Sequence, residues 1–244
     1  MGTRPRNIFI IGAQCTGKTT LVYALKEHFE RQLVDDIPQP VFISELARNV
    51  MKQLKIDRHE IATLPERSFT LQKAILHAQD KAEIMVTNEA GGWYISDRSG
   101  IDPIVYTRLL VGEDAATELL DSEVWSRLQR NMKDGLVFLC EDGCTWLVDD
   151  GTRLMPKDLE DWSKSDHAFR KLLEEKEIGY TLISKDVADI ADRLCRATHV
   201  HGSISSTVDT SGMRLFTSGS PRTSMPANPE LGGEEEVEEE DDDL

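Results

Sequence analysis

A glycine-bounded loop near the start of the sequence constrains this chain more than any other segment. Residues 12–19 read Gly-Ala-Gln-Cys-Thr-Gly-Lys-Thr, which matches the pattern G-x-x-x-x-G-K-[ST] in full. The β-branched run at 7–12 predicts a buried strand before the loop, and apolar residues at helical spacing over 18–33 predict a helix after it. A strand, a glycine loop and a helix in this order are typical of a phosphate-binding loop, or P-loop.

Each part of this P-loop has a chemical task. We expect Gly12 and Gly17 to let the backbone curl so that its N–H groups point at phosphates, aided by the positive end of the following helix. Lys18 would supply a positive charge to the β- and γ-phosphates, and the Thr19 hydroxyl would be a ligand for Mg²⁺. Cys15 is interpreted as a small filler and not as a redox switch. The predicted nucleotide contacts are Gly12, Ala13, Gln14, Cys15, Thr16, Gly17, Lys18, Thr19 and Thr20.

Strand-like and helix-like segments alternate along the rest of the chain. Further strands are predicted at 40–43, 93–96, 136–140 and 180–184, and helices from about 45 and at 65–88, 102–110, 114–132, 159–176 and 187–198. The apolar stripe of the long helix at 65–88 is interpreted as core. Five strands alternating with helices predict a three-layer α/β domain, with a parallel sheet covered on both faces.

Charge divides the chain into two parts. The formal charge of −16 is uneven, because residues 201–244 carry a net −9 and the other 200 residues −7. Dense like charge and low hydrophobicity predict a disordered acidic tail over 201–244, after a folded domain over 5–198. A passive solubilising role is favoured for this tail over a docking or autoinhibitory one. The acidic surface repels a nucleic-acid backbone, so DNA and RNA binding are not expected.

Cysteine usage points to a reducing compartment, and hydropathy argues against a membrane span. The four cysteines are scattered and do not complete a zinc site. No stretch approaches the ~20 apolar residues of a membrane span. We therefore expect reduced thiols and a soluble, cytoplasmic protein without a transmembrane segment.

A charged tetrapeptide follows the predicted third strand. It reads Asp97-Arg98-Ser99-Gly100, and a carboxylate at the tip of an apolar strand near a P-loop is the Walker B arrangement, so Asp97 is predicted to hold Mg²⁺ together with Thr19. The guanidinium of Arg98 would point its positive charge and paired N–H donors at a phosphate. The same residues fit D-x-x-G, a GTPase switch element. The guanine-reading pattern N-K-x-D is missing where the chain reads Ser184-Lys185-Asp186-Val187, which counts against a Ras-like GTPase.

Two more residues are candidates for contact with a phosphoryl acceptor. Glu45 follows the second predicted strand, where ligands of α/β sheets bind, and would orient or deprotonate a hydroxyl nucleophile. Its alternative role is to stabilise a helix N-terminus. Arg153, in the charged stretch 149–153, would lie on a lid that closes over the site, and would neutralise the charge that develops on the transferred phosphoryl group. Its alternative is a place in a solvated loop.

With these motifs assembled, the chain resembles the NadR/TRP-trafficking type family of AAA-like P-loop domains, whose bacterial members include a nicotinamide riboside kinase domain. The resemblance covers about residues 5–198 and rests on GAQCTGKTT, on SELAR, on YISDRSGIDPIVY at 94–106, and on DDGTR followed by YTLIS. It implies a nucleoside-kinase-like fold with the sheet order 2-3-1-4-5. It also implies that Asp97 and Arg98 match the family's D/E-R-S motif and that Glu45 matches its acidic residue after the second strand.

The predicted function is transfer of the γ-phosphoryl group of ATP, or of GTP, to a hydroxyl of a small nucleoside-like metabolite, with nicotinamide riboside as one candidate. The predicted catalytic residues are Lys18, Glu45, Asp97, Arg98 and Arg153, with Mg²⁺ held by Thr19 and Asp97. Animal members of the family are associated with GTP and phosphoinositide binding, which implies an alternative: a regulatory nucleotide switch that acts through a protein or phosphoinositide partner. A third alternative is an inactive scaffold that binds nucleotide without turnover.

Overall fold

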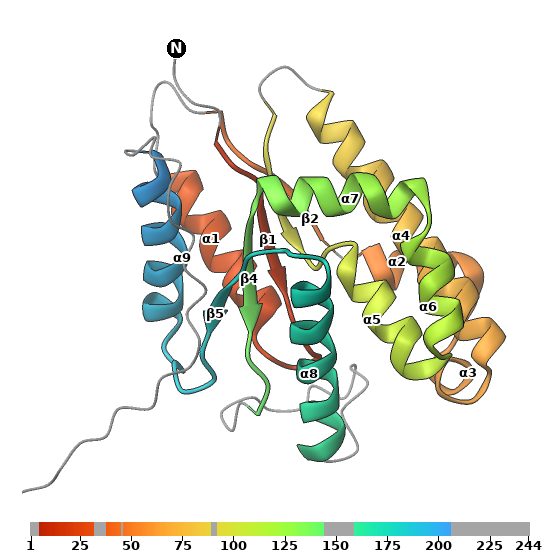
Figure 1. The fold of residues 1–244 in the computed structure, drawn as a ribbon. Helices are drawn as coiled ribbons and strands as arrows, with labels where there is room; N and C mark the ends of the chain where they lie inside the picture. The colour runs from red at the N-terminus through yellow and green to blue at the C-terminus, as the bar shows by residue number, and fades with distance from the viewer. Residues whose placement is uncertain (1–4, 32–37, 45, 89–91, 144–158, 206–244) are drawn as a thin grey trace, which may run out of the picture. The chain divides into compact units, whose positions relative to one another are not determined.

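The computed structural model describes residues 5–31, 38–44, 46–88, 92–143 and 159–205, and their side chains except at 159–161 and 199–205. One sheet runs through the described chain, in the order β2-β3-β1-β4-β5 with every pairing parallel (Figure 1). Its strands are β1 (Ile8–Ile11), β2 (Val41–Ile43), β3 (Tyr94–Asp97), β4 (Leu136–Cys140) and β5 (Thr181–Ile183). The predicted sheet and its order are confirmed.

Helices cover both faces of this sheet. They are α1 (Lys18–Arg31), α2 (Leu46–Leu54), α3 (Arg58–Thr63), α4 (Pro65–Thr87), α5 (Ile101–Leu110), α6 (Glu113–Leu120), α7 (Glu123–Asp134), α8 (Leu159–Glu175) and α9 (Ile190–Ser205). Helices α1 and α9 pack on one face, and α4, α5, α7 and α8 lie on the other (Figure 1). The predicted three-layer arrangement is confirmed.

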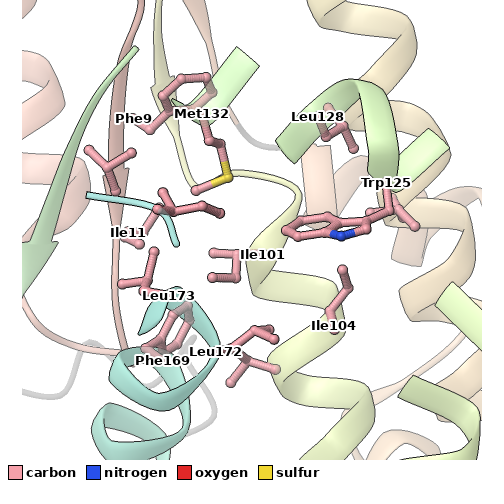
Figure 2. Close-up of a cluster of buried hydrophobic side chains, with 14 of the residues drawn as sticks. Phe9, Ile11, Ile101, Ile104, Trp125, Leu128, Met132, Phe169, Leu172 and Leu173 are labelled. Atoms are coloured by element: carbon pink, nitrogen blue, oxygen red, sulfur yellow. The ribbon is translucent and has the colours of Figure 1, made fainter. Parts of the chain in front are cut away.

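The central strand β1 is buried on both of its sides. Phe9 and Ile11 join the larger apolar cluster, beneath α4 to α8, whereas Ile8 and Ile10 join the smaller cluster beneath α1 and α9. Figure 2 shows the larger cluster, where side chains from β1, α5, α7 and α8 meet. Alternation along a strand sends successive side chains to opposite faces, so β1 needs apolar residues throughout. The P-loop therefore starts from a strand that is fixed on both sides.

The predicted helix at 114–132 was wrong in one respect, because two helices, α6 and α7, occupy this stretch. The break falls at Ser122, whose hydroxyl accepts the backbone N–H of Trp125 at 3.1 Å and so caps α7. Serine competes for backbone hydrogen bonds in this way and favours helix starts. Helix α3 was not predicted, although Asp57 and Glu60 form a capping box at its start.

Helix α9 differs from its predicted range. It begins at Ile190 and continues to Ser205, so it passes residue 198 and enters the segment predicted as tail. Residues 206–244 lie outside the described part of the chain, so the disorder of the tail and the domain boundaries stay predictions. Among the residues that the structure describes, no helix is both long and apolar enough to cross a bilayer.

Candidate nucleotide-binding site

The P-loop leaves β1 at a position that only glycine fills without strain. Gly12 has φ +131°, and a Cβ there would lie 2.5 Å from the carbonyl oxygen of Cys140 on β4. Both the backbone conformation and the close approach of β4 exclude a side chain. Gly17, at the other end of the loop, has φ +77°. The two glycines thus allow the curl that the motif predicts.

Lys18, the first residue of α1, reaches back across the loop. Its ammonium group donates to the carbonyl of Ala13 and, at 3.3 Å, to the hydroxyl of Thr16. The side chain is buried, and this burial, with the positive charge of Arg98, lowers the pKa of Lys18 to about 8. Desolvation disfavours the charged form of any amine in this way. Lys18 is therefore placed at the loop with a charge that is sensitive to pH near neutrality.

Thr19 and Asp97 meet as the motif analysis predicts. Asp97 ends β3, in register with Ile10 of β1, and the Thr19 hydroxyl donates to its Oδ2 atom at 2.7 Å. A hydroxyl and a carboxylate are hard oxygen ligands of the type that Mg²⁺ prefers. The chemistry of this pair fits Mg²⁺, although metal binding itself stays a prediction.

Arg98 follows Asp97 in a conformation that is uncommon for a residue with a side chain. Its φ is +83°, and its backbone N–H donates to the carbonyl of Ile10 at 2.9 Å. A left-handed conformation costs roughly 1–2 kcal/mol for a non-glycine residue. Such strain tends to persist at functional sites, where surrounding contacts enforce it. The backbone here turns the Arg98 side chain away from the direction that a regular strand would give it.

Asp102 holds this arginine in place. Its Oδ1 atom lies 3.1 Å from Nη1 of Arg98, and its Oδ2 atom accepts the backbone N–H of Ser99 at 2.8 Å. The carboxyl is buried, which raises its pKa, while Arg98 and Lys18 oppose that shift. Sequence reasoning missed Asp102 as a site residue. The available signal was its spacing, four residues after Arg98 at the start of a helix.

Two residues from the C-terminal part of the domain also contact the P-loop. The indole N–H of Trp162 on α8 donates to the carbonyl of Gln14 at 2.7 Å, and Nη1 of Arg193 on α9 donates to the carbonyl of Thr16 at 2.9 Å. Both contacts join residues more than 140 positions apart. Sequence patterns carry no signal for them, so neither residue was predicted.

The structure brings together only part of the predicted catalytic set. Lys18, Asp97 and Arg98 lie close together at the P-loop, since the charges of Asp97 and Arg98 both affect the pKa of the Lys18 ammonium group. Glu45 and Arg153 lie outside the described residues, so their roles stay predictions. Thr20, the third residue of α1, is exposed to solvent.

This geometry can be compared with known proteins. A family model described as an AAA domain matches residues 7–193, more than three quarters of the chain. The chain belongs to the AAA domain family. The matched stretch of this AAA domain includes the P-loop, Asp97, Arg98 and Arg193. No curated protein matches the sequence.

Solved structures resemble this AAA domain at low sequence identity. Deoxyadenosine kinase from M. mycoides, with the products dCMP and a flexible dCDP bound, gives a TM-score of 0.57 at 12% identity, over 81% of this chain and 99% of that one. The same enzyme with dCTP bound gives 0.57 at 13% identity, over the same shares of the two chains. NadR in complex with NR gives 0.56 at 20% identity over 87% of this chain, which spans 54% of the NadR chain. These likenesses show a nucleoside-kinase-like P-loop fold.

Proposed function

We propose that the protein is a Mg²⁺-dependent kinase that moves the γ-phosphoryl group of ATP to a hydroxyl of a small nucleoside-like metabolite. The observation that carries this proposal is the contact of Thr19 with Asp97 beside Lys18. A metal-ligating pair and a phosphate-binding lysine at one edge of the sheet are the parts that phosphoryl transfer requires. Their setting is a fold like that of nucleoside kinases.

In this proposal the protein acts by positioning and electrostatics, as phosphoryl transfer demands. Lys18 and the loop amides hold the β- and γ-phosphates. Thr19 and Asp97 hold Mg²⁺, which when bound supplies positive charge to the phosphate oxygens. Arg98, oriented by Asp102, neutralises charge that develops on the transferred group.

The acceptor is proposed to be a nucleoside or a close analogue. The similar structures are those of a deoxyadenosine kinase and of NadR with NR, so both a deoxynucleoside and nicotinamide riboside are candidates. Glu45 is proposed to orient or deprotonate the acceptor hydroxyl, and Arg153 to add positive charge beside the phosphates. Glu45 and Arg153 both lie outside the residues that the structure describes, so their roles rest on the sequence alone.

One packing contact favours a kinase over a nucleotide-driven switch. Gly100, the last residue of the D-x-x-G match, has φ −64°, and a Cβ there would lie 2.7 Å from Cδ1 of Leu128. This glycine is therefore accounted for by the close packing of the start of α5 on α7. A switch element needs a backbone that is free to move. A regulatory GTP-binding role, through a protein or phosphoinositide partner, is the alternative that the following assay would reveal.

The test is nucleotide consumption by the purified chain with Mg²⁺, using ATP and GTP in parallel, with and without a panel of nucleosides that includes nicotinamide riboside. A kinase consumes nucleotide faster when its acceptor is added, and Lys18→Ala should lose this turnover. Glu45→Gln should keep nucleotide affinity and lower kcat by roughly 10² or more. Slow turnover that is indifferent to every acceptor, with base-selective binding, would instead support the switch.

A further inference from the structure

Two backbone carbonyl groups of the P-loop accept hydrogen bonds from side chains that lie outside the loop. Gln14 accepts from the indole of Trp162 at 2.7 Å, and Thr16 accepts from the guanidinium of Arg193 at 2.9 Å. These donors come from different helices, α8 and α9, and belong to neither the phosphate-binding motif nor the Asp97 segment. We call Trp162 and Arg193 the outer donors.

The outer donors fix the direction in which loop amides point. In a planar trans peptide the C=O and N–H groups face opposite ways. A bond from Trp162 to the Gln14 carbonyl therefore directs the N–H of Cys15 away from the indole. By the same geometry, Arg193 directs the N–H of Gly17 away from its guanidinium. Loop amides are the groups that a P-loop uses to bind phosphate.

We propose that Trp162 and Arg193 are positioning residues, which preorganise the Cys15 and Gly17 amides of the P-loop for a phosphate chain. Neither residue is proposed to touch the nucleotide. Their role rests on the proposed function, since it concerns phosphate binding by the loop. Donors that are held in place before a ligand arrives cost no reorganisation when it binds.

The surroundings of Arg193 support a positioning role. The residue is 1% exposed, and its guanidinium also donates to the carbonyl of Val187 at 2.7 Å and to that of Ser184 at 3.5 Å. It lies in the first turn of α9, where the helix dipole disfavours a positive charge. Burial of a guanidinium is also costly unless acceptors satisfy it. Despite both costs, the guanidinium of Arg193 stays buried, and its hydrogen bonds link the segment after β5 to the P-loop.

Trp162 lies near the start of α8, a helix that the larger core cluster anchors further along its length. An indole has a single N–H donor, and the Gln14 carbonyl occupies it. Helix α8 is anchored in the larger core through Phe169, Leu172 and Leu173, which Figure 2 shows among the side chains of α5 and α7. Because the core anchors α8, it restricts the movement of the helix that carries the indole.

The test uses Trp162→Phe, which removes the N–H and keeps an aromatic ring, and Arg193→Met, with Arg193→Lys as a gentler second variant. Two controls accompany them. Arg196→Met changes an exposed arginine on the same helix. Arg127→Met breaks the two-bond ion pair with Asp80, far along the chain from the P-loop, and so controls for a general loss of stability.

The first readout is the ¹⁵N order parameter of the Cys15 and Gly17 amides, measured without any nucleotide. We expect rigid-backbone values of about 0.85 in the wild type. Trp162→Phe should lower the value for Cys15, and Arg193→Met that for Gly17, to below about 0.6. Both controls should keep the wild-type values. Unchanged order parameters in folded variants would overturn the proposal.

The second readout is the dissociation constant of ADP and of inorganic tripolyphosphate, which has no base or sugar. Each outer-donor variant should weaken both ligands about tenfold, with Arg193→Lys in between, because a lost hydrogen bond frees the loop. A variant that weakens ADP and leaves tripolyphosphate unchanged would contradict the proposal. If the wild type binds neither ligand, the proposed function fails, whereas the order parameters still decide whether the outer donors fix the loop.

Discussion

Thr19 Oγ1 donates a 2.7 Å hydrogen bond to Oδ2 of Asp97, which lies 78 positions away in the chain. The bond links the first turn of α1 to the end of β3 and places two oxygen ligands side by side. These two oxygen atoms would hold Mg²⁺ in the proposed site.

Replacement of Thr19 should therefore act through Mg²⁺. Thr19→Val keeps the shape of the side chain and removes the ligand, and it should weaken Mg²⁺-nucleotide binding about 10- to 100-fold. Thr19→Ser keeps the hydroxyl and should bind nearly as the wild type does. Titration of ADP with Mg²⁺ and with EDTA separates the effects, since metal-free affinity should be similar in all three proteins. A Thr19→Val variant with wild-type metal dependence would remove Thr19 from the metal site.

Nucleotide affinity should fall as the pH rises through about 8. Burial lowers the pKa of Lys18 to about 8, and bound phosphates favour its charged form. The charge is therefore present below this pH and lost above it, so the dissociation constant of ADP should rise about tenfold between pH 7 and pH 9. Calorimetry across this range measures the effect.

The matched control for this pH dependence is Cys15→Ser, which removes the thiol of the loop and should leave the profile unchanged. Lys18→Arg keeps its charge throughout the range and should give a flat profile at lower affinity. A flat profile for the wild type would show that Lys18 does not control phosphate binding by its charge.

Gly12→Ala should destabilise the fold more than Gly112→Ala does. Both glycines have φ near +130°, but a Cβ at Gly12 would lie 2.5 Å from the Cys140 carbonyl, whereas nothing lies within 4 Å at Gly112. Backbone strain alone should cost Gly112→Ala about 1–3 kcal/mol of unfolding free energy. The added clash should make the loss in Gly12→Ala larger by about another 1–3 kcal/mol. Urea denaturation compares the two, and equal losses would mean that the contact with β4 is unimportant.

Arg98 and Asp102 should behave as one unit in catalysis. Arg98→Met removes the charge and should lower kcat about 100-fold, while Asp102→Asn loosens the arginine and should lower kcat about tenfold. In the double variant the loss should equal that of Arg98→Met alone, because Asp102 acts through Arg98. Additive losses in this double-mutant cycle would give Asp102 a separate role.

Local patterns made the sheet and the P-loop predictable. Neighbouring residues in the sequence are enough to predict the strands β1 and β4 from their apolar runs, and the loop from the glycines at 12 and 17. The meeting of Thr19 with Asp97 followed from the rule that parallel strands present their carboxyl ends at one edge. These parts of the fold and site were expected and are found.

Other features depend on tertiary contacts that a sequence pattern does not show. The break between α6 and α7 was missed because the capping role of Ser122 competed with a continuous apolar periodicity. The left-handed backbone of Arg98 depends on its bond to Ile10 and on the buried Asp102. The contact of Arg193 with the Thr16 carbonyl joins residues 177 positions apart, and no local pattern indicates it.

The most direct test of the central claim follows the γ-phosphate itself. ATP labelled at the γ-phosphate is incubated with the protein, Mg²⁺ and each nucleoside in turn, and the label is located in the separated products. A kinase places the label on the acceptor, and Lys18→Ala abolishes this transfer. Label found solely in inorganic phosphate, at a rate that no acceptor changes, would contradict the account and identify the protein as a nucleotide hydrolase or switch.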